Sequence, residues 1–286
     1  MIYEKLSVLA YVEEYINTTP NADITKEELV AKIDKGRVTN VTHLIKTLGQ
    51  ISKKSKESIE QARTQIAEII NSSNKEIIFT SGATESINLA LKGYTETNLD
   101  KGTHIITVKT EHKAVLATCE YLETKGFEVT YLDVDKNGLI SLDQLRDSVR
   151  KNTSLIVIMY VNNEIGVIQP IKEIGIICKE KDIVFFCDAT QAIGKVDVDV
   201  EESFIDMLCF SGHKINGPKG IGVLYKSNEL MLSPLLHGGG QEQLQGNLEQ
   251  FSFPGPASGS CIGSPGDGLC YFANRLFQLC QYSDRL

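Results

Sequence analysis

The feature that most constrains the fold is a regular alternation of short apolar runs and helical stretches between Lys75 and Tyr225. The runs are rich in β-branched residues, and the stretches between them have the apolar spacing of helices. Such alternation is typical of a largely parallel sheet covered by helices. Seven strands are predicted, at Glu76–Thr80, His104–Val108, Glu128–Leu132, Leu155–Tyr160, Ile183–Asp188, Met207–Ser211 and Gly222–Tyr225.

Helices are predicted around these strands, and one has a clear start signal. Ser141 and Gln144 have the spacing of a capping box, which favours a helix that begins there. The predicted helices are Gln61–Asn71, Glu85–Lys92, Lys113–Lys125, Leu142–Arg150 and Ile171–Lys181. The fold class is therefore α/β, with helices on both faces of a mostly parallel seven-stranded sheet.

The two ends of the chain have a different character. Residues 1–50 contain one plausible helix, Lys26–Lys35, but no strand rhythm. From Gln243 to about Gly268, glycine, proline and serine dominate, which is typical of loop. We expect a divergent segment at 1–50, a large domain at 51–243 and an irregular tail at 244–286.

Composition excludes several classes of protein. A formal charge of -8 argues against a broadly basic nucleic-acid surface. No apolar run approaches the roughly 18 residues of a membrane span, and the N-terminus lacks a secretion signal, so we expect a cytoplasmic protein. The seven cysteines form no C-x-x-C pairs, so neither a metal site nor a disulfide framework is expected. Cys178, Cys187 and Cys209 lie in apolar runs and are interpreted as buried.

Three segments carry chemistry at strand ends. Thr80 to Ser86 follows a strand and opens a helix, where backbone N–H groups and the Thr84 hydroxyl would face a phosphate; an ordinary capped helix start is the alternative. Asp188 ends an apolar strand, where open α/β sheets bind ligands, although it could instead cap the next helix.

The third segment places Lys214 after another strand, before a glycine-rich turn. Partial desolvation there would free its amine for carbonyl chemistry; an ordinary solvated loop lysine is the alternative. A phosphate cradle, an acid and a lysine together are what pyridoxal 5′-phosphate (PLP) requires, because the acid keeps the pyridine nitrogen protonated. Lys214 is the predicted Schiff-base lysine.

With those residues placed, the chain resembles the class V aminotransferase-like PLP enzymes of fold type I, and within them the cysteine desulfurases of the iron–sulfur cluster type. The resemblance runs from about Gln50 to Gln243. Six motifs carry it: Phe79–Ser86, Thr110–His112, Asn162–Gly166, Asp188–Ala192, Ser211–Lys214 and His237–Glu242.

The resemblance implies a role for each site residue. Lys214 would bind the cofactor's aldehyde, Asp188 would pair with the pyridine nitrogen, and His112 would stack on the ring and handle protons. A helix-start histidine satisfied by the backbone is the alternative for His112. The phosphate would be held by Ala83, Thr84, Ser211 and His213, and the region of the ring oxygen by Asn163 and Gln191.

The chain departs from the family at both ends. The N-terminal turn is represented only by Asn17–Pro20, and after Gln243 neither the Arg-Ser-Gly-Thr string nor the small C-terminal domain is found. That domain normally carries the catalytic cysteine. Cys261 follows Ser-Gly-Ser and is the candidate persulfide carrier here, with an incidental tail cysteine as the alternative.

The resulting hypothesis is a cysteine desulfurase that converts L-cysteine to L-alanine and passes sulfur to an iron–sulfur scaffold or a tRNA-thiolation enzyme. The resemblance also implies a homodimer, with no direct nucleic-acid or membrane partner. The alternative is a catalytically impaired paralogue or remnant that binds a partner. A nucleotide-binding domain is disfavoured, because neither G-x-G-x-x-G after a first strand nor a P-loop is present.

Overall fold

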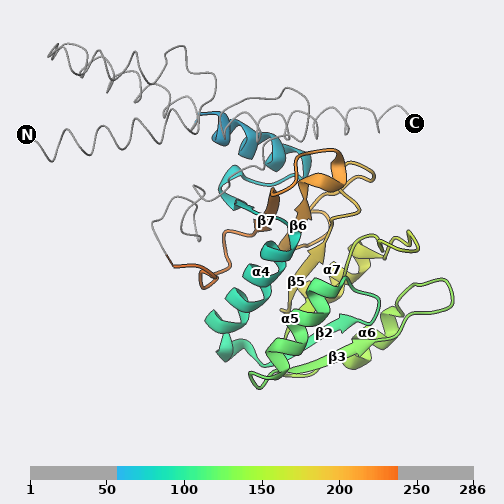
Figure 1. The fold of residues 1–286 in the computed structure, drawn as a ribbon. Coiled ribbons are helices and arrows are strands. Elements are labelled where there is room, and N and C mark those ends of the chain that lie inside the picture. The colour runs from blue at the N-terminus through green and yellow to red at the C-terminus, as the bar shows by residue number, and fades with distance from the viewer. Residues whose placement is uncertain (1–56, 238–286) are drawn as a thin grey trace, which may run out of the picture. The chain divides into compact units, whose positions relative to one another are not determined.

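The computed structural model describes residues 57–237 (Figure 1). From Gln61 onward these residues belong to one of two compact units of the chain. The predictions for residues 1–50 and 244–286, among them the helix Lys26–Lys35 and the role of Cys261, lie outside the described residues. The boundaries proposed at residues 50 and 243 therefore remain predictions.

Seven strands form one sheet in the order β1-β7-β6-β5-β4-β2-β3. β7 runs antiparallel to β1 and β6, and the remaining neighbours are parallel. The mostly parallel seven-stranded sheet is confirmed. The strands are β1 (Ile77–Thr80), β2 (His104–Val108), β3 (Glu128–Leu132), β4 (Thr153–Val157), β5 (Val184–Asp188), β6 (Met207–Ser211) and β7 (Gly222–Lys226).

Helices cover both faces of this sheet, as predicted, with α4 and α5 on one side and α6 and α7 on the other (Figure 1). A further helix spans residues 57–69. Ser141 caps α6 by accepting the Gln144 N–H at 3.2 Å, so this helix begins where the sequence predicts. The named helices are α4 (Ala83–Thr97), α5 (Lys113–Glu123), α6 (Leu142–Ser148) and α7 (Ile171–Glu180).

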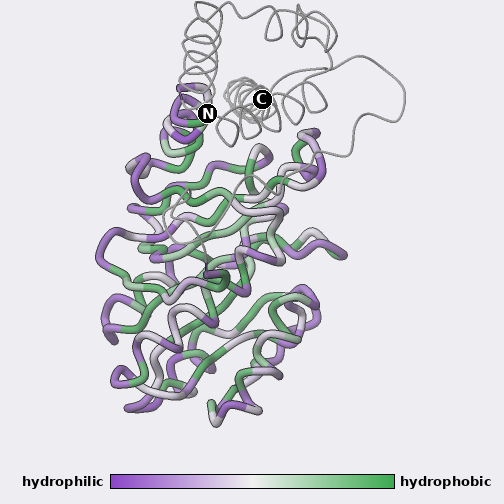
Figure 2. The backbone as a smooth tube through the Cα atoms, turned by 60° about the vertical axis from the view of Figure 1, so that its left-hand side comes forward, coloured by the Kyte–Doolittle hydropathy of each residue, from purple (hydrophilic) through white to green (hydrophobic). Residues whose placement is uncertain are grey.

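The core is built from strands that are buried on both faces. Neighbouring residues of a strand point to opposite sides, so Phe186 packs in the cluster that includes α4 and α5, while Phe185 is buried outside it. Figure 2 shows hydrophobic residues along the strands and hydrophilic ones along the outer helical turns and loops. Among residues 57–237, no helix is both long and apolar enough to cross a membrane.

The topology gathers functional groups at one edge of the sheet. β2, β4, β5 and β6 are parallel, and β1 has the same direction because β7 is antiparallel to both β1 and β6. Their carboxyl ends therefore meet at a common edge, which is where open α/β sheets bind ligands. Each strand of this set is followed by one of the motifs singled out in the sequence.

Candidate functional site

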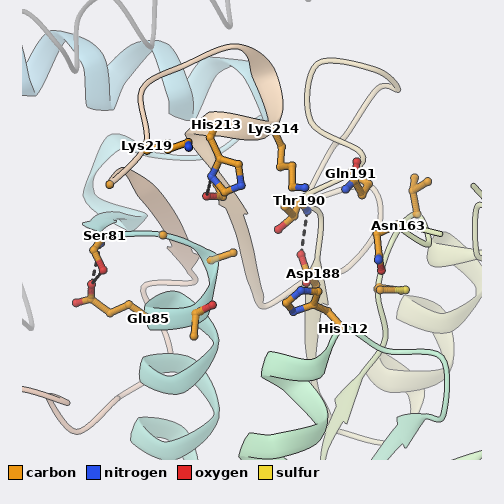
Figure 3. A pocket seen from close by; sticks show the side chains of 17 residues that line it. Ser81, Glu85, His112, Asn163, Asp188, Thr190, Gln191, His213, Lys214 and Lys219 are labelled. Atoms are coloured by element: carbon orange, nitrogen blue, oxygen red, sulfur yellow. Dashed lines mark hydrogen bonds between the residues drawn. The ribbon is translucent and has the colours of Figure 1, made fainter. Parts of the chain in front are cut away.

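A pocket of about 480 Å³ lies at this edge, and all nine residues predicted to bind the cofactor line it (Figure 3). In that view Ser81 and His213 lie on the left, Gln191 and Asn163 on the right, and Lys214 between them. The roles of these residues remain predictions. The nine are Ala83, Thr84, His112, Asn163, Asp188, Gln191, Ser211, His213 and Lys214.

One end of the pocket is the start of α4. The first N–H groups of a helix have no partner inside the helix, so Ala83 and Thr84 present donors where they line the pocket. Glu85 also lines it, but its Oε2 accepts the Ser81 N–H at 2.7 Å and the Ser81 hydroxyl at 2.5 Å. The acid thus holds the turn before α4, and the helix start remains suited to an anion.

A close backbone contact fixes the position of this helix start. Gly222 begins β7 opposite Thr80, and a Cβ atom on Gly222 would lie 2.4 Å from the Cα atom of Gly82. Real Cβ atoms do not approach a backbone so closely, so only glycine fits at residue 222 without movement. The absence of a side chain there lets the turn at Gly82 lie directly on the sheet, beside the pocket.

Lys214 lies on a single turn of 3-10 helix, Gly212–Ile215, directly after β6. Asn216 ends this turn with a φ of 59°, a left-handed conformation that asparagine tolerates better than most residues. His213 Nδ1 lies 2.9 Å from Ser211 Oγ, and burial, followed by the charges of Lys214 and Lys219, lowers the pKa of His213. His213 is therefore a neutral hydrogen-bonding group at neutral pH. Lys214 itself is exposed in the pocket, without the desolvation that the sequence suggested.

Asp188 is buried at the end of β5, 5% exposed. One of its carboxylate oxygens accepts the N–H of Thr190 at 2.9 Å. Residues 190–195 form turns, so this bond caps a turn and not an α-helix, and it is compatible with the place of Asp188 in the pocket. The carboxylate lies between the strand end and the pocket, with His112 beside it in Figure 3.

His112 has two roles in the geometry. Its Nδ1 accepts the Ala114 N–H at 3.1 Å and so caps the start of α5, as the alternative reading of this histidine expected. The same ring also lines the pocket. With Nδ1 accepting, a neutral ring carries its proton on Nε2. His112 can therefore cap α5 through Nδ1 and still serve the pocket through the rest of its ring.

Gln191 is oriented by a neighbour that the sequence did not single out. Lys195 Nζ donates to Gln191 Oε1 at 2.7 Å, which leaves the amide N–H groups of Gln191 as donors to the pocket. Burial, and then the charge of Lys214, lowers the pKa of Lys195. Asn163, on the loop that follows β4, is exposed at the same side of the pocket.

Sequence reasoning gave no individual role to several polar residues of the site. Lys219 and Thr190 line the pocket, Lys195 holds Gln191, and Glu111 is buried next to His112. Lys219 follows the glycine-rich turn after Lys214, and Glu111 lies inside a quoted motif, so both had a local signal. No group of His, Cys, Asp and Glu side chains within 57–237 is arranged to hold a metal ion.

Known proteins share this fold and sequence. The family model "Aminotransferase class-V" matches residues 25–259. The cysteine desulfurase IscS of Ehrlichia chaffeensis is 54% identical over 193 residues, which are 66% of this chain and 47% of that protein. That of Pseudoalteromonas translucida is 47% identical over 233 residues, which are 80% of this chain and 57% of that protein.

Solved structures agree with these sequence relatives. "SspA in complex with cysteine" matches with a TM-score of 0.70 and 44% identity, over 79% of this chain and 61% of that one. A "NIFS-like protein" matches with a TM-score of 0.73 and 37% identity, over 82% and 61%. The chain spans about half the length of the curated relatives it matches. The chain belongs to the aminotransferase class-V family.

Proposed function

We propose that this chain is a PLP-dependent cysteine desulfurase, which takes sulfur from L-cysteine and leaves L-alanine. The observation that carries the proposal is the convergence of Lys214, Asp188 and the start of α4 on one pocket. The relatives named cysteine desulfurase, and a neighbour whose structure was solved with cysteine, support this substrate for the class-V fold found here.

The residues present fit the cofactor. The start of α4, pressed against the sheet at Gly222, would hold the phosphate together with Ser211 and His213. Asp188, at the end of β5, would hold the pyridine nitrogen, and Gln191 would donate to the ring oxygen. Lys214 supplies the amine for the aldehyde.

When bound, the cofactor would supply an electron sink, which accepts the electron pair left on the substrate carbon that carries the amino group. Asp188 keeps that sink effective by holding a proton on the pyridine nitrogen. His112 and Lys214, which both line the pocket, would move protons. In the overall reaction a thiolate attacks the substrate sulfur, an S–S bond forms, the C–S bond breaks, and its electron pair returns to carbon, which is protonated to give alanine.

The structure restricts which thiol can accept the sulfur. The cysteines within 57–237 are all buried: Cys119, Cys178, Cys187 and Cys209. Burial raises the pKa of each thiol, to about 12 for Cys119, so their thiolates are scarce at neutral pH. The expected burial of Cys178, Cys187 and Cys209 is confirmed. The persulfide carrier is therefore sought among Cys261, Cys270 and Cys280 or in another protein.

The function is tested by incubating the PLP-loaded chain with L-cysteine in the absence of reductant and measuring L-alanine and protein-bound persulfide. We expect both to form, with the persulfide mapping to Cys261, and we expect Cys261→Ser to stop both in the first turnover. A Cys187→Ser variant is the matched control, because that thiol is buried. Failure of the loaded chain to release alanine would contradict the proposal, and persulfide on Cys270 or Cys280 would move the assignment.

Asp188→Asn is expected to leave the fold intact but to slow alanine release by about 10²-fold or more, because a neutral amide does not hold a proton on the pyridine nitrogen. The amide oxygen can still accept the Thr190 N–H. The measurement is alanine release alongside the melting temperature, with Asp197→Asn, an exposed residue nearby, as the control. Unchanged turnover in Asp188→Asn would remove this role.

Further features of the proposal rest on the family resemblance. We propose a cytoplasmic homodimer that passes sulfur to an iron–sulfur scaffold or a tRNA-thiolation enzyme. The His237–Glu242 string, which resembles the iron–sulfur type of desulfurase, supports the choice of acceptor class. Light scattering of the purified chain, and sulfur transfer to a purified scaffold, test the two parts separately.

A further inference from the structure

Glu111 links two strand ends beneath the pocket. It lies after β2, directly before His112, and is only 6% exposed. Its Oε1 accepts the N–H of Met159, just after β4, at 2.5 Å. Met159 lines the pocket, so this bond ties the wall after β4 to the segment that carries His112.

The second oxygen of Glu111 has no such partner. Glu111 Oε2 is buried without a hydrogen bond, and none of the ion pairs among residues 57–237 involves this side chain. A buried carboxylate without a cation is costly. The titratable groups that face it are Asp188 and Cys187 on β5 and Cys119 on α5, none of which is a cation at any pH.

The surroundings of Glu111 also favour its protonated form. Burial, and then the charge of Asp188, raises the pKa of Glu111 well above its ordinary value, while the bond from Met159 lowers it by less. Both effects favour the protonated, neutral form of Glu111. Asp188 lines the pocket, where it would face a cationic ring, whereas Glu111 is buried behind the lining.

We propose that Glu111 is a positioning residue that acts as a neutral acid behind the pocket: it holds Met159 in the wall and leaves Asp188 as the charged carboxylate beside the ring. The second half of this proposal rests on the proposed function, since it assumes that PLP occupies the pocket. A charged Glu111 would instead place a second negative charge in a buried site that offers it no cation.

The first test needs no cofactor and compares the full chain with Glu111→Gln, which keeps the acceptor for Met159 but cannot ionise. A group whose pKa is raised in the folded state makes stability fall as pH rises above the unfolded pKa, about 4.3 for glutamate. The melting temperature of Glu111→Gln relative to the original chain should therefore increase from about pH 5 to about pH 8. Glu120→Gln, an exposed change on α5, reports the effect of removing one surface carboxylate. A difference that does not grow beyond that of this control would contradict the proposal.

The second test measures PLP binding at neutral pH. Glu111→Gln should bind within about twofold of the original chain, whereas Glu111→Leu, which leaves the buried Met159 N–H without an acceptor, should bind roughly tenfold more weakly. Equal weakening in both variants would show that charge on Glu111 is required. If the original chain does not bind PLP, the proposed function fails, while the pH series still decides the protonation of Glu111.

A third measurement does not depend on whether any variant folds. Infrared spectra of the original chain with ¹³C-labelled glutamate should retain a shifted band of a protonated carboxyl group at about pH 8. Asp206, whose pKa is raised to about 6 by burial, is ionised there and is unlabelled. Absence of a labelled protonated band at this pH would overturn the inference.

Discussion

Replacing Lys214 with alanine is expected to abolish covalent attachment of PLP and to lower alanine release by about 10⁴-fold or more, because the amine that binds the aldehyde and moves protons is lost. Lys214 is exposed and lies on the short turn Gly212–Ile215. Its removal should therefore change the free energy of unfolding by less than about 0.5 kcal/mol. The readouts are the visible absorbance of the loaded chain, its turnover and its melting temperature.

Lys219 provides the matched comparison, because it is a second lysine of the same pocket. Lys219→Ala removes an equal charge, so PLP should bind roughly tenfold more weakly but still form the yellow covalent complex. If Lys214→Ala retained the visible band and Lys219→Ala lost it, Lys219 and not Lys214 would be the lysine that binds PLP covalently. A loss of the band in both variants would mean that charge, rather than the specific amine, governs attachment.

Changing His112 should separate its two roles. His112→Asn keeps a good N-cap for α5, so stability should hold, while turnover falls by about 10²-fold or more because the ring that stacks and moves protons is gone. His112→Ala loses the cap as well and should also cost about 1 kcal/mol of stability. Alanine release and denaturant unfolding measure the two effects independently.

Ser141→Ala is the control for capping alone. Ser141 caps α6 through the Gln144 N–H and does not line the pocket, so its loss should lower stability and leave turnover unchanged. Wild-type turnover in His112→Asn would reduce His112 to a helix cap. A large loss of stability in His112→Asn would show that the ring also packs in a way that asparagine does not replace.

Strand positions were predictable because buried parallel strands have strong local patterns. β2, β3 and β6 have the predicted bounds. β4 was predicted to start two residues later and to continue to Tyr160, but it ends at Val157. Residues 158–160 still bond to β5, through the Tyr160 N–H to Asp188 O at 2.9 Å, as the chain turns toward the pocket. A run of apolar residues in the sequence does not reveal where a strand stops pairing with its neighbour in the sheet.

Helix α4 shows a different limit. It was predicted to end at Lys92 but continues to Thr97, past Gly93. A Cβ atom on Gly93 would lie 2.6 Å from the backbone oxygen of Ser233, so this glycine permits a close contact with a distant segment and does not end the helix. Local propensity disfavours glycine inside helices, and a contact 140 residues away has no local signal.

The site was predictable where one residue type at a strand end has a specific chemistry. Lys214 and Asp188 stood out because an amine and an acid at adjacent strand ends suit one cofactor. Glu111 and Lys195 did not stand out, because their effect depends on what each side chain touches: Met159 for one and Gln191 for the other. Those contacts arise from the packing of separate loops and have no sequence pattern.

The claim that Lys214 holds PLP in this pocket is tested most directly by borohydride reduction of the loaded chain, followed by peptide mapping. Reduction converts the labile bond between the aldehyde and the amine into a stable one. The account predicts a pyridoxyl group on Lys214. A label on Lys195 or Lys219, which lie close to the same pocket, or no label in a chain that retains PLP, would contradict it.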